Sequence, residues 1–450
     1  MLTFLKNTNR LDLLKITIGI ALVIQVLISY PLWLTTARTF PFVPIIGNST
    51  MEASDFIHWL LFLTVLGGSL SIVIFYKKKL FTYLLIGVLI LMMLLDATRI
   101  QAWTYQYLLM LLVLGLYAFS SIPKKKPIEI SQPESRKSKK AKKKQAQKKA
   151  IQKSVQPKVI SKVEAPEKKE LYSYFLLTLQ LILILTYLWS GMQKLNIYFA
   201  NDVFPWLMTS FSFLEPLGEF AYLGYAVAIM EALLGVGLFF FRTRKITIWA
   251  ATAFHLIIII FLAGLKWNYV VWAWNIAMIA FNWILFSDKA VFKNSSNVSF
   301  ALLKGIFKTK KSATAAFSLV IILFGIMPLF NFFGHWDEQL SLKMYAGASS
   351  EALFYFNDED LECVPTVHLK KVYEGIYSEE SRIDMDDWAF DELTVPAYGG
   401  NWAYKRAGYE FCTCLEEKGL AGIEIFNVNR WNRRTDTEIL PCNKLIKQFE

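Results

Sequence analysis

Residues 171–196 read LYSYFLLTLQLILILTYLWSGMQKLN, and this stretch determines the class of fold. No charged side chain precedes Lys194 in it. An α-helix needs about 20 apolar residues to cross a hydrocarbon core about 30 Å thick. The stretch therefore predicts a membrane-spanning helix over residues 171–193.

The same criterion predicts nine spans in the chain of 450 residues, and hence an all-α polytopic membrane helix bundle. With 55% hydrophobic and only 19% charged residues, the composition excludes a disordered, fibrous or disulfide-scaffold protein. The first span has no small-residue cleavage site, so we expect an anchor rather than a cleaved signal peptide. The spans are 12–33, 56–76, 79–95, 103–119, 171–193, 219–241, 246–265, 268–286 and 314–333.

The excess of basic residues is confined to one segment. The chain has 48 Lys and Arg against 36 Asp and Glu, a net charge of +12. Residues 123–170 alone hold 17 basic and 5 acidic residues, which is also a net of +12, and they contain no aromatic residue to stack on bases. We therefore expect a disordered cytosolic linker that contacts anionic lipid, and no nucleic-acid partner.

Basic residues also predict the orientation of the bundle. Five basic clusters occur before the first span and after the second, fourth, sixth and eighth spans, so they fall on one side of a nine-span bundle. The positive-inside rule places that side in the cytoplasm. We expect a cytoplasmic N-terminus, an extracytoplasmic region after residue 333, and a bacterial cytoplasmic membrane as the location.

Residues 334–450 have a different composition, with 12 basic and 22 acidic residues. Strand-like runs and a helix from Asn401, as N-cap, to Lys418 predict a small α+β extracytoplasmic domain. The runs are 340–345, 353–356, 366–372 and 422–428. The predicted units are thus 1–122 with four spans, the 123–170 linker, 171–333 with five spans, and 334–450.

All four cysteines lie in this last region, at Cys363, Cys412, Cys414 and Cys442. In an extracytoplasmic domain they predict up to two disulfides, with three possible connectivities. A zinc site that uses His368 is the alternative, but the spacing does not match the usual ligand pattern. We expect disulfides and no metal.

Ionisable side chains inside predicted spans are candidate functional residues, because burying them in lipid is costly. Glu231 and His255 lie at similar depths in spans six and seven. They either hold the two helices together by a hydrogen bond or take part in chemistry. Lys194, at the outer end of span five, is either a snorkelling anchor or, if desolvated, a general base with a lowered pKa.

Further polar residues gather on the predicted outer side. Asp96 and Arg99 fall in the turn before Trp103, spaced to form an i, i+3 pair, and His335 and Asp337 follow the last span. We expect these five residues to surround a substrate pocket. The chain contains no Gly-x-Ser-x-Gly, Walker or His-Glu-x-x-His motif.

The order Lys194, Glu231, His255 resembles the horizontally transferred transmembrane (HTTM) domain family, which includes vitamin K-dependent γ-glutamyl carboxylase. Residues 187–196, YLWSGMQKLN, resemble the family's tyrosine, small-Gly, Lys-Leu segment, and Phe254-His255 matches a Phe-His pair. Residues 94–98 and 334–337 resemble the family's outer turn and the start of its lumenal domain. Trp103 departs from the pattern, since the carboxylase has a histidine there.

This resemblance implies that Lys194 is the base that deprotonates a reduced quinone, supported by His255 and Glu231. The first hypothesis is therefore a membrane enzyme with an outward-facing pocket. The alternative is a non-catalytic membrane protein that presents its outer domain to an extracytoplasmic protein partner. The enzyme is favoured if the three residues line one cavity, and it is rejected if they face separate sides. A transporter is disfavoured, because the two halves show no internal repeat.

Overall fold

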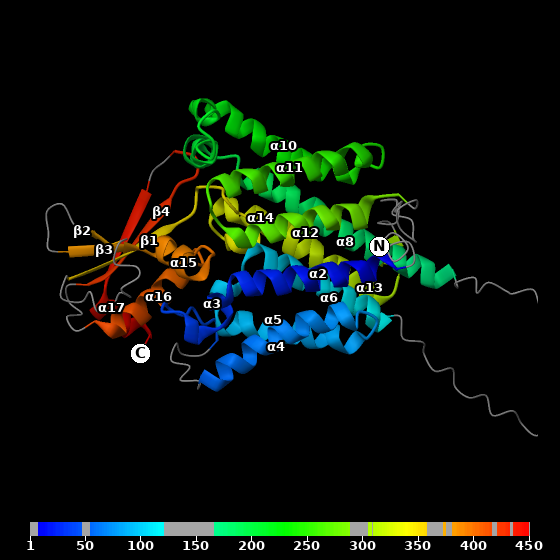
Figure 1. Ribbon diagram of the computed structural model, residues 1–450, viewed down its shortest axis with the longest axis horizontal. Coiled ribbons are helices and arrows are strands. Elements are labelled where there is room, and N and C mark those ends of the chain that lie inside the picture. The colour runs from blue at the N-terminus through cyan, green and yellow to red at the C-terminus, as the bar shows by residue number, and fades with distance from the viewer. Residues whose placement is uncertain are drawn as a thin grey trace, which may run out of the picture.

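The computed structural model describes residues 8–46, 55–120, 166–288, 305–307, 309–357, 372–374, 380–415, 421–432 and 435–449. Long helices run side by side, with a small sheet domain at one end (Figure 1). The helices are α2 Arg10–Ile28, α4 Asp55–Ile74, α5 Lys79–Leu95, α6 Ala102–Ser120, α8 Pro166–Gln193, α10 Ala221–Phe239, α11 Arg244–Gly264, α12 Tyr269–Phe286 and α13 Lys311–Val320.

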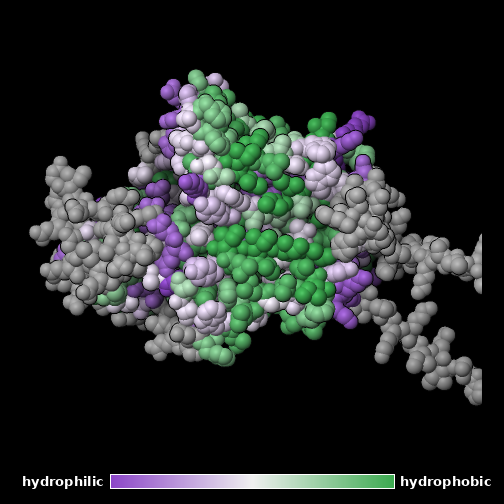
Figure 2. Space-filling view, in the orientation of Figure 1, coloured by the Kyte–Doolittle hydropathy of each residue, from purple (hydrophilic) through white to green (hydrophobic). Residues whose placement is uncertain are grey.

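Each predicted span coincides with a helix or a helical run. Eight are long and apolar enough to cross a membrane, and the remaining one, α5, has 17 residues. Figure 2 shows the corresponding hydrophobic band over the bundle, with hydrophilic side chains at its ends. The last run continues α13 through η7 (Ile321–Ile326, a π-helix), α14 (Met327–Phe330) and η8 (Asn331–Phe333). Pro328 has no N–H to donate, which accounts for the irregular hydrogen bonding there.

Short elements connect the bundle helices at the end that carries the sheet domain. The first predicted span is broken at Ser29, after which α3 begins with a proline at its second position. Among them, η2 forms the turn before α6, and η4 follows α8. The six short elements are α3 Tyr30–Trp33, η1 Thr35–Ala37, η2 Ala97–Arg99, η4 Phe199–Val203, α9 Phe204–Met208 and η5 Glu215–Glu219.

The basic turns share one end of the bundle. Lys15 Nζ donates to the carbonyl of Tyr76 at 2.8 Å, which joins α2 to the α4–α5 turn. Arg10 donates to the carbonyl of Ser287 at 2.8 Å, which joins α2 to the end of α12. We call this the basic end, and the opposite one the domain end. The predicted alternation of basic loops agrees with this arrangement, although residues 121–165, most of the predicted linker, lie outside the described residues.

The C-terminal domain has the predicted α+β character. Its antiparallel sheet has the strand order β2-β3-β1-β4-β5. Alternate residues of β1, Ala352, Phe354 and Phe356, are buried, and the ring of Phe354 stacks on Phe411 of α16 at 4.3 Å. The elements are β1 Glu351–Asn357, β2 Val372–Glu374, β3 Glu380–Asp384, α15 Met385–Leu393, α16 Asn401–Cys414, β4 Gly422–Val428, β5 Thr435–Pro441 and α17 Cys442–Phe449.

Three local predictions in this domain were wrong. The helix expected to reach Lys418 ends at Cys414, because Leu415 adopts extended backbone with ψ 142°. Residues 340–345 form no strand but a 3₁₀ turn (η9, Gln339–Ser341) and irregular backbone, because Leu342 and Tyr345 adopt positive φ angles of 59° and 52°. Asn401 is the first helical residue of α16 rather than its cap, which is Gly400 at φ 119°. Residues 353–356 and 422–428 do lie in strands, and 366–371 lie outside the described residues.

A disulfide between Cys412 and Cys442 joins α16 to α17. Cys414 is also disulfide-bonded. Cys363 and His368 lie outside the described residues. The disulfide interpretation of these cysteines is therefore supported at the three that the structure describes.

The C-terminal domain is anchored to the domain end by polar contacts. The Glu392 carboxylate of α15 accepts hydrogen bonds from the hydroxyl of Thr39 and the backbone N–H of Phe40, both at 2.9 Å. From the turn after β4, Arg430 donates to the backbone carbonyl of Gln193 at 2.8 Å. The domain therefore fixes the segment that carries Lys194.

Candidate functional site

Two glycines bring α8 and α10 into close contact. A Cβ on Gly191 would lie 2.4 Å from the backbone nitrogen of Ala232, and one on Gly235 would lie 2.6 Å from the carbonyl oxygen of Ile184. Any larger residue would force the helix backbones apart. This contact sets the distance between the ion-pair residues described next, since one follows α8 and the other lies in α10.

Lys194 and Glu231 form a buried ion pair. Lys194 Nζ lies 2.9 Å from Glu231 Oε2 and donates to the hydroxyl of Ser190 at 2.7 Å. The two residues are only 8% and 7% exposed. Lys194 is therefore not a snorkelling anchor, because its amine points into the bundle. Such a pair forms inside a protein only where good geometry offsets the cost of desolvating both charges.

His255 belongs to a hydrogen-bond chain rather than to a pair with Glu231. Its Nε2 lies 2.5 Å from the hydroxyl of Tyr187, and its Nδ1 lies 2.6 Å from Asn275 Oδ1. Asn275 donates from its amide nitrogen to the carbonyl of Val271, so its oxygen faces the histidine. His255 Nδ1 therefore carries the proton, and the Tyr187 hydroxyl donates to Nε2. Asn282 completes the chain by donating to the Tyr187 oxygen at 2.5 Å.

These groups line one cavity of about 160 Å³ inside the bundle, which we call the bundle cavity. At about 30 Å³ per water molecule it has room for roughly five of them, or for a small ring system. Lys194, Glu231, His255 and Tyr187 form its polar wall. The other walls are mostly apolar side chains, among them Phe199, Phe204, Leu207, Phe254, Ile258, Phe261 and Met278. The three residues singled out in the sequence thus face the same space.

The five residues predicted to form a substrate pocket do not lie together. Asp96 is fully buried and pairs with Arg38 at 2.7 Å, while Arg99 lies 4.0 Å away. Burial alone raises the pKa of Asp96, but Arg38, Arg99 and hydrogen bonds from Thr98 outweigh it and hold this pKa below its ordinary value. This cluster fastens the chain at the domain end.

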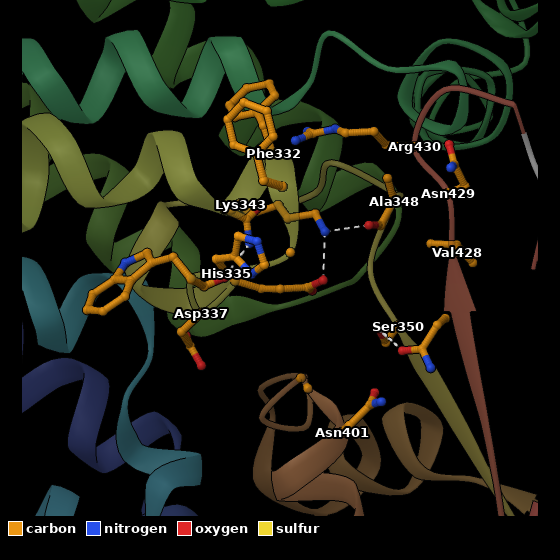
Figure 3. A pocket seen from close by; sticks show the side chains of 18 of the residues that line it. Phe332, His335, Asp337, Lys343, Ala348, Ser350, Asn401, Val428, Asn429 and Arg430 are labelled. Atoms are coloured by element: carbon orange, nitrogen blue, oxygen red, sulfur yellow. Dashed lines mark hydrogen bonds and ion pairs between the residues drawn. The ribbon is translucent and has the colours of Figure 1, made fainter. Parts of the chain in front are cut away.

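Trp103 lines a second cavity of about 340 Å³ between the bundle and the C-terminal domain, the junction chamber. The chamber shares Val271, Met344 and Tyr345 with the bundle cavity. His335 and Asp337 line a third space, the domain cleft, which shares Glu338 and Lys343 with the chamber (Figure 3). The five predicted residues are therefore divided between an ion cluster and two adjoining cavities.

Two amide residues were missing from the sequence prediction: Asn275, which lines the bundle cavity, and Asn282, which hydrogen-bonds the cavity residue Tyr187. Only ionisable side chains within the spans were considered, whereas Asn275 and Asn282 are neutral. Both occur in the apolar run of α12, seven positions apart and hence on one helix face. Buried amides at that spacing are the signal that identifies them. Arg38 lies in a loop and carries no such signal.

Among the described residues, no group of three His, Cys, Asp or Glu side chains is placed to hold a metal ion. No family model, curated protein or solved structure matches the chain.

Proposed function

We propose that the chain is a multi-pass membrane enzyme whose bundle cavity removes a proton from an acidic hydroxyl of a lipid-soluble substrate. The observation that carries this proposal is the buried Lys194–Glu231 pair, which opens onto a mostly apolar cavity between helices. An ion pair that serves only to join two helices does not require such a space beside it. The resemblance to the HTTM domain family points to a reduced quinone as the substrate class.

The pair can supply a base without a net change of charge. Transfer of a proton from the Lys194 ammonium to the Glu231 carboxylate, over the 2.9 Å between them, makes both groups neutral. Low polarity favours that neutral form because neither group then needs hydration. The free amine takes a proton from the substrate hydroxyl. The products are a Lys194 ammonium, a protonated Glu231 and a substrate anion held beside the cation.

The hydrogen-bond chain through His255 supports this chemistry indirectly. Each of its groups has a defined donor or acceptor role, so the Tyr187 ring is held against the cavity. Tyr187 also lies within one helical turn of Ser190, which bonds Lys194. We infer that Tyr187 and His255 shape and orient the wall that a planar substrate would contact.

The test uses full-length protein in phospholipid nanodiscs, supplied with a reduced naphthoquinone, dissolved oxygen and bicarbonate. We expect oxidised or epoxidised quinone to accumulate above the rate without protein, and Lys194→Ala to abolish that increase. Lys245→Ala is the matched control, because Lys245 is exposed at the opposite end of the bundle. Full turnover by Lys194→Ala would overturn the proposal.

A further inference from the structure

The domain cleft is a large space of about 850 Å³ that the proposed chemistry does not use. It lies where the last span meets the C-terminal domain. Figure 3 shows Asn401 of α16, Asn429 after β4, and Arg430 beside Phe332 around its opening. The cleft is therefore built by three elements that are far apart in the sequence.

The cleft is lined by two basic and two acidic residues, whose charges sum to zero, and each of them has a partner within the protein. Lys343 Nζ lies 2.7 Å from Glu338 Oε1 and also donates to the carbonyl of Ala348. Arg430 donates to both the backbone and side-chain oxygens of Gln193. Asp337 accepts hydrogen bonds from Tyr398 and from the backbone of Leu340. A ligand with a high net charge would find no excess of opposite charge here.

What the cleft offers instead is neutral polar groups beside indole rings. Asn331 Oδ1 and Trp336 Nε1 are buried and have no hydrogen-bond partner in the described part of the chain. One is an acceptor and the other a donor. Trp402 and Trp431 stand at the cleft with 45% and 61% of their surface exposed. Amide and indole groups beside exposed aromatic rings suit a ligand that both donates and accepts hydrogen bonds.

We propose that the domain cleft binds a neutral saccharide. Each sugar hydroxyl both donates and accepts, which matches amide and indole groups of mixed character, and the apolar face of a sugar ring packs on exposed tryptophan. The saccharide is either the headgroup of a glycolipid or a soluble oligosaccharide. The cleft lies beside Phe333, an exposed aromatic residue at the end of the last span, so a headgroup can reach it from the bilayer surface.

The binding test uses full-length protein in phosphatidylcholine nanodiscs, because the sugar headgroups of glycoside detergents would compete for the cleft. One arm titrates soluble oligosaccharides of glucose, galactose, mannose and N-acetylglucosamine and measures their binding by saturation-transfer NMR. A second arm places a neutral diglycosyl diacylglycerol in the nanodisc and follows the thermal stability of the protein. A third arm titrates a doubly acidic peptide and inorganic phosphate.

We expect saturable binding in at least one of the first two arms, weakened about tenfold or more by Trp402→Ala. Ile439→Ala, an exposed apolar residue of β5 outside the cleft lining, is the control and should bind as the parent does. Binding in the second arm alone identifies a glycolipid, and binding in the first identifies a soluble sugar. Absence of binding in both arms, equal binding by Trp402→Ala, or binding in the third arm only would overturn the proposal.

Discussion

Gly191 of α8 lies directly against Ala232 of α10, so closely that a Cβ on the glycine would come within 2.4 Å of the alanine nitrogen. Lys194 follows this contact by three residues, and Glu231 immediately precedes Ala232. The distance between the two helix backbones therefore determines the distance between the charged groups of the ion pair. A residue with no chemistry of its own determines whether the pair forms.

Gly191→Ala should both destabilise the protein and impair the bundle cavity. Because the clash is with backbone atoms, the helices must separate, and we expect a loss of about 1–3 kcal/mol. Thermal unfolding in nanodiscs and the quinol assay measure the two effects. Gly67→Ala in α4 is the control, since a Cβ there meets nothing within 4 Å and alanine favours the helix. Equal stability of the two variants would contradict the packing argument.

Removal of one ion-pair partner should destabilise the protein more than removal of both. Lys194→Met leaves Glu231 as a buried charge without its partner, which costs about 3–5 kcal/mol. Lys194→Met combined with Glu231→Leu removes both charges and should recover most of that stability while remaining inactive. Chemical or thermal unfolding of the two single variants and the double variant completes a mutant cycle. Additive losses would show that the pair is not coupled.

The free energy of unfolding should fall as the pH rises, because Asp386 loses its proton. Burial, together with the nearby Asp384, raises the pKa of Asp386 to about 8. The folded chain therefore binds a proton that the unfolded chain, with an Asp pKa near 3.9, has already released. This contribution to stability is complete below about pH 4 and is lost as the pH rises through about 8.

Asp386→Asn is the variant that tests this dependence. The asparagine oxygen can still accept the N–H of Ala397, which bonds Asp386 at 2.9 Å. We expect the variant to match the parent in thermal stability at pH 4 to 5 and to exceed it at pH 8. The raised pKa of Asp386 would be refuted if the difference in thermal stability between the parent and Asp386→Asn did not change with pH over that range.

The Cys412–Cys442 bond should stabilise the C-terminal domain. It closes a loop with a sequence separation of 30, and a disulfide of that size contributes about 2–4 kcal/mol. Cys442→Ser paired with Cys412→Ser should lower the free energy of unfolding of the domain by that amount. The stability of the helix bundle should change less. Limited proteolysis can test this, because it reports on the domain and the bundle separately. An unchanged digestion pattern for the domain would be the contrary result.

The helical architecture was predictable because lipid imposes a simple length and polarity requirement on each span. All nine predicted spans coincide with helices or helical runs, and the basic residues Arg10 and Lys15 and the turn after α4 lie at one end of the bundle. The charged residues of the bundle cavity were also evident, since Lys194, Glu231 and His255 stand out in apolar surroundings. Their roles in catalysis remain predictions.

The failures occurred where tertiary contacts override local pattern. Residues 340–345 alternate like a strand, yet Tyr345 is held with a positive φ between two cavities. Arg38 could not be connected with Asp96 from sequence, because the partners are 58 positions apart and joined only in the folded chain. Asp96 and Arg99 consequently belong to a buried ion cluster and line none of the three described cavities.

The contact between α2 and α12 has a consequence for how the protein is made. Arg10 donates to the carbonyls of Ile284 and Ser287, and the Ile284 carbonyl is 274 residues further along the chain. Gln25, near the other end of α2, donates to Val270 of α12. The α2–α12 contact can therefore form only after every helix between them has been synthesised. This part of the bundle closes late, whereas α2 can pack against α4 as soon as α4 has been made.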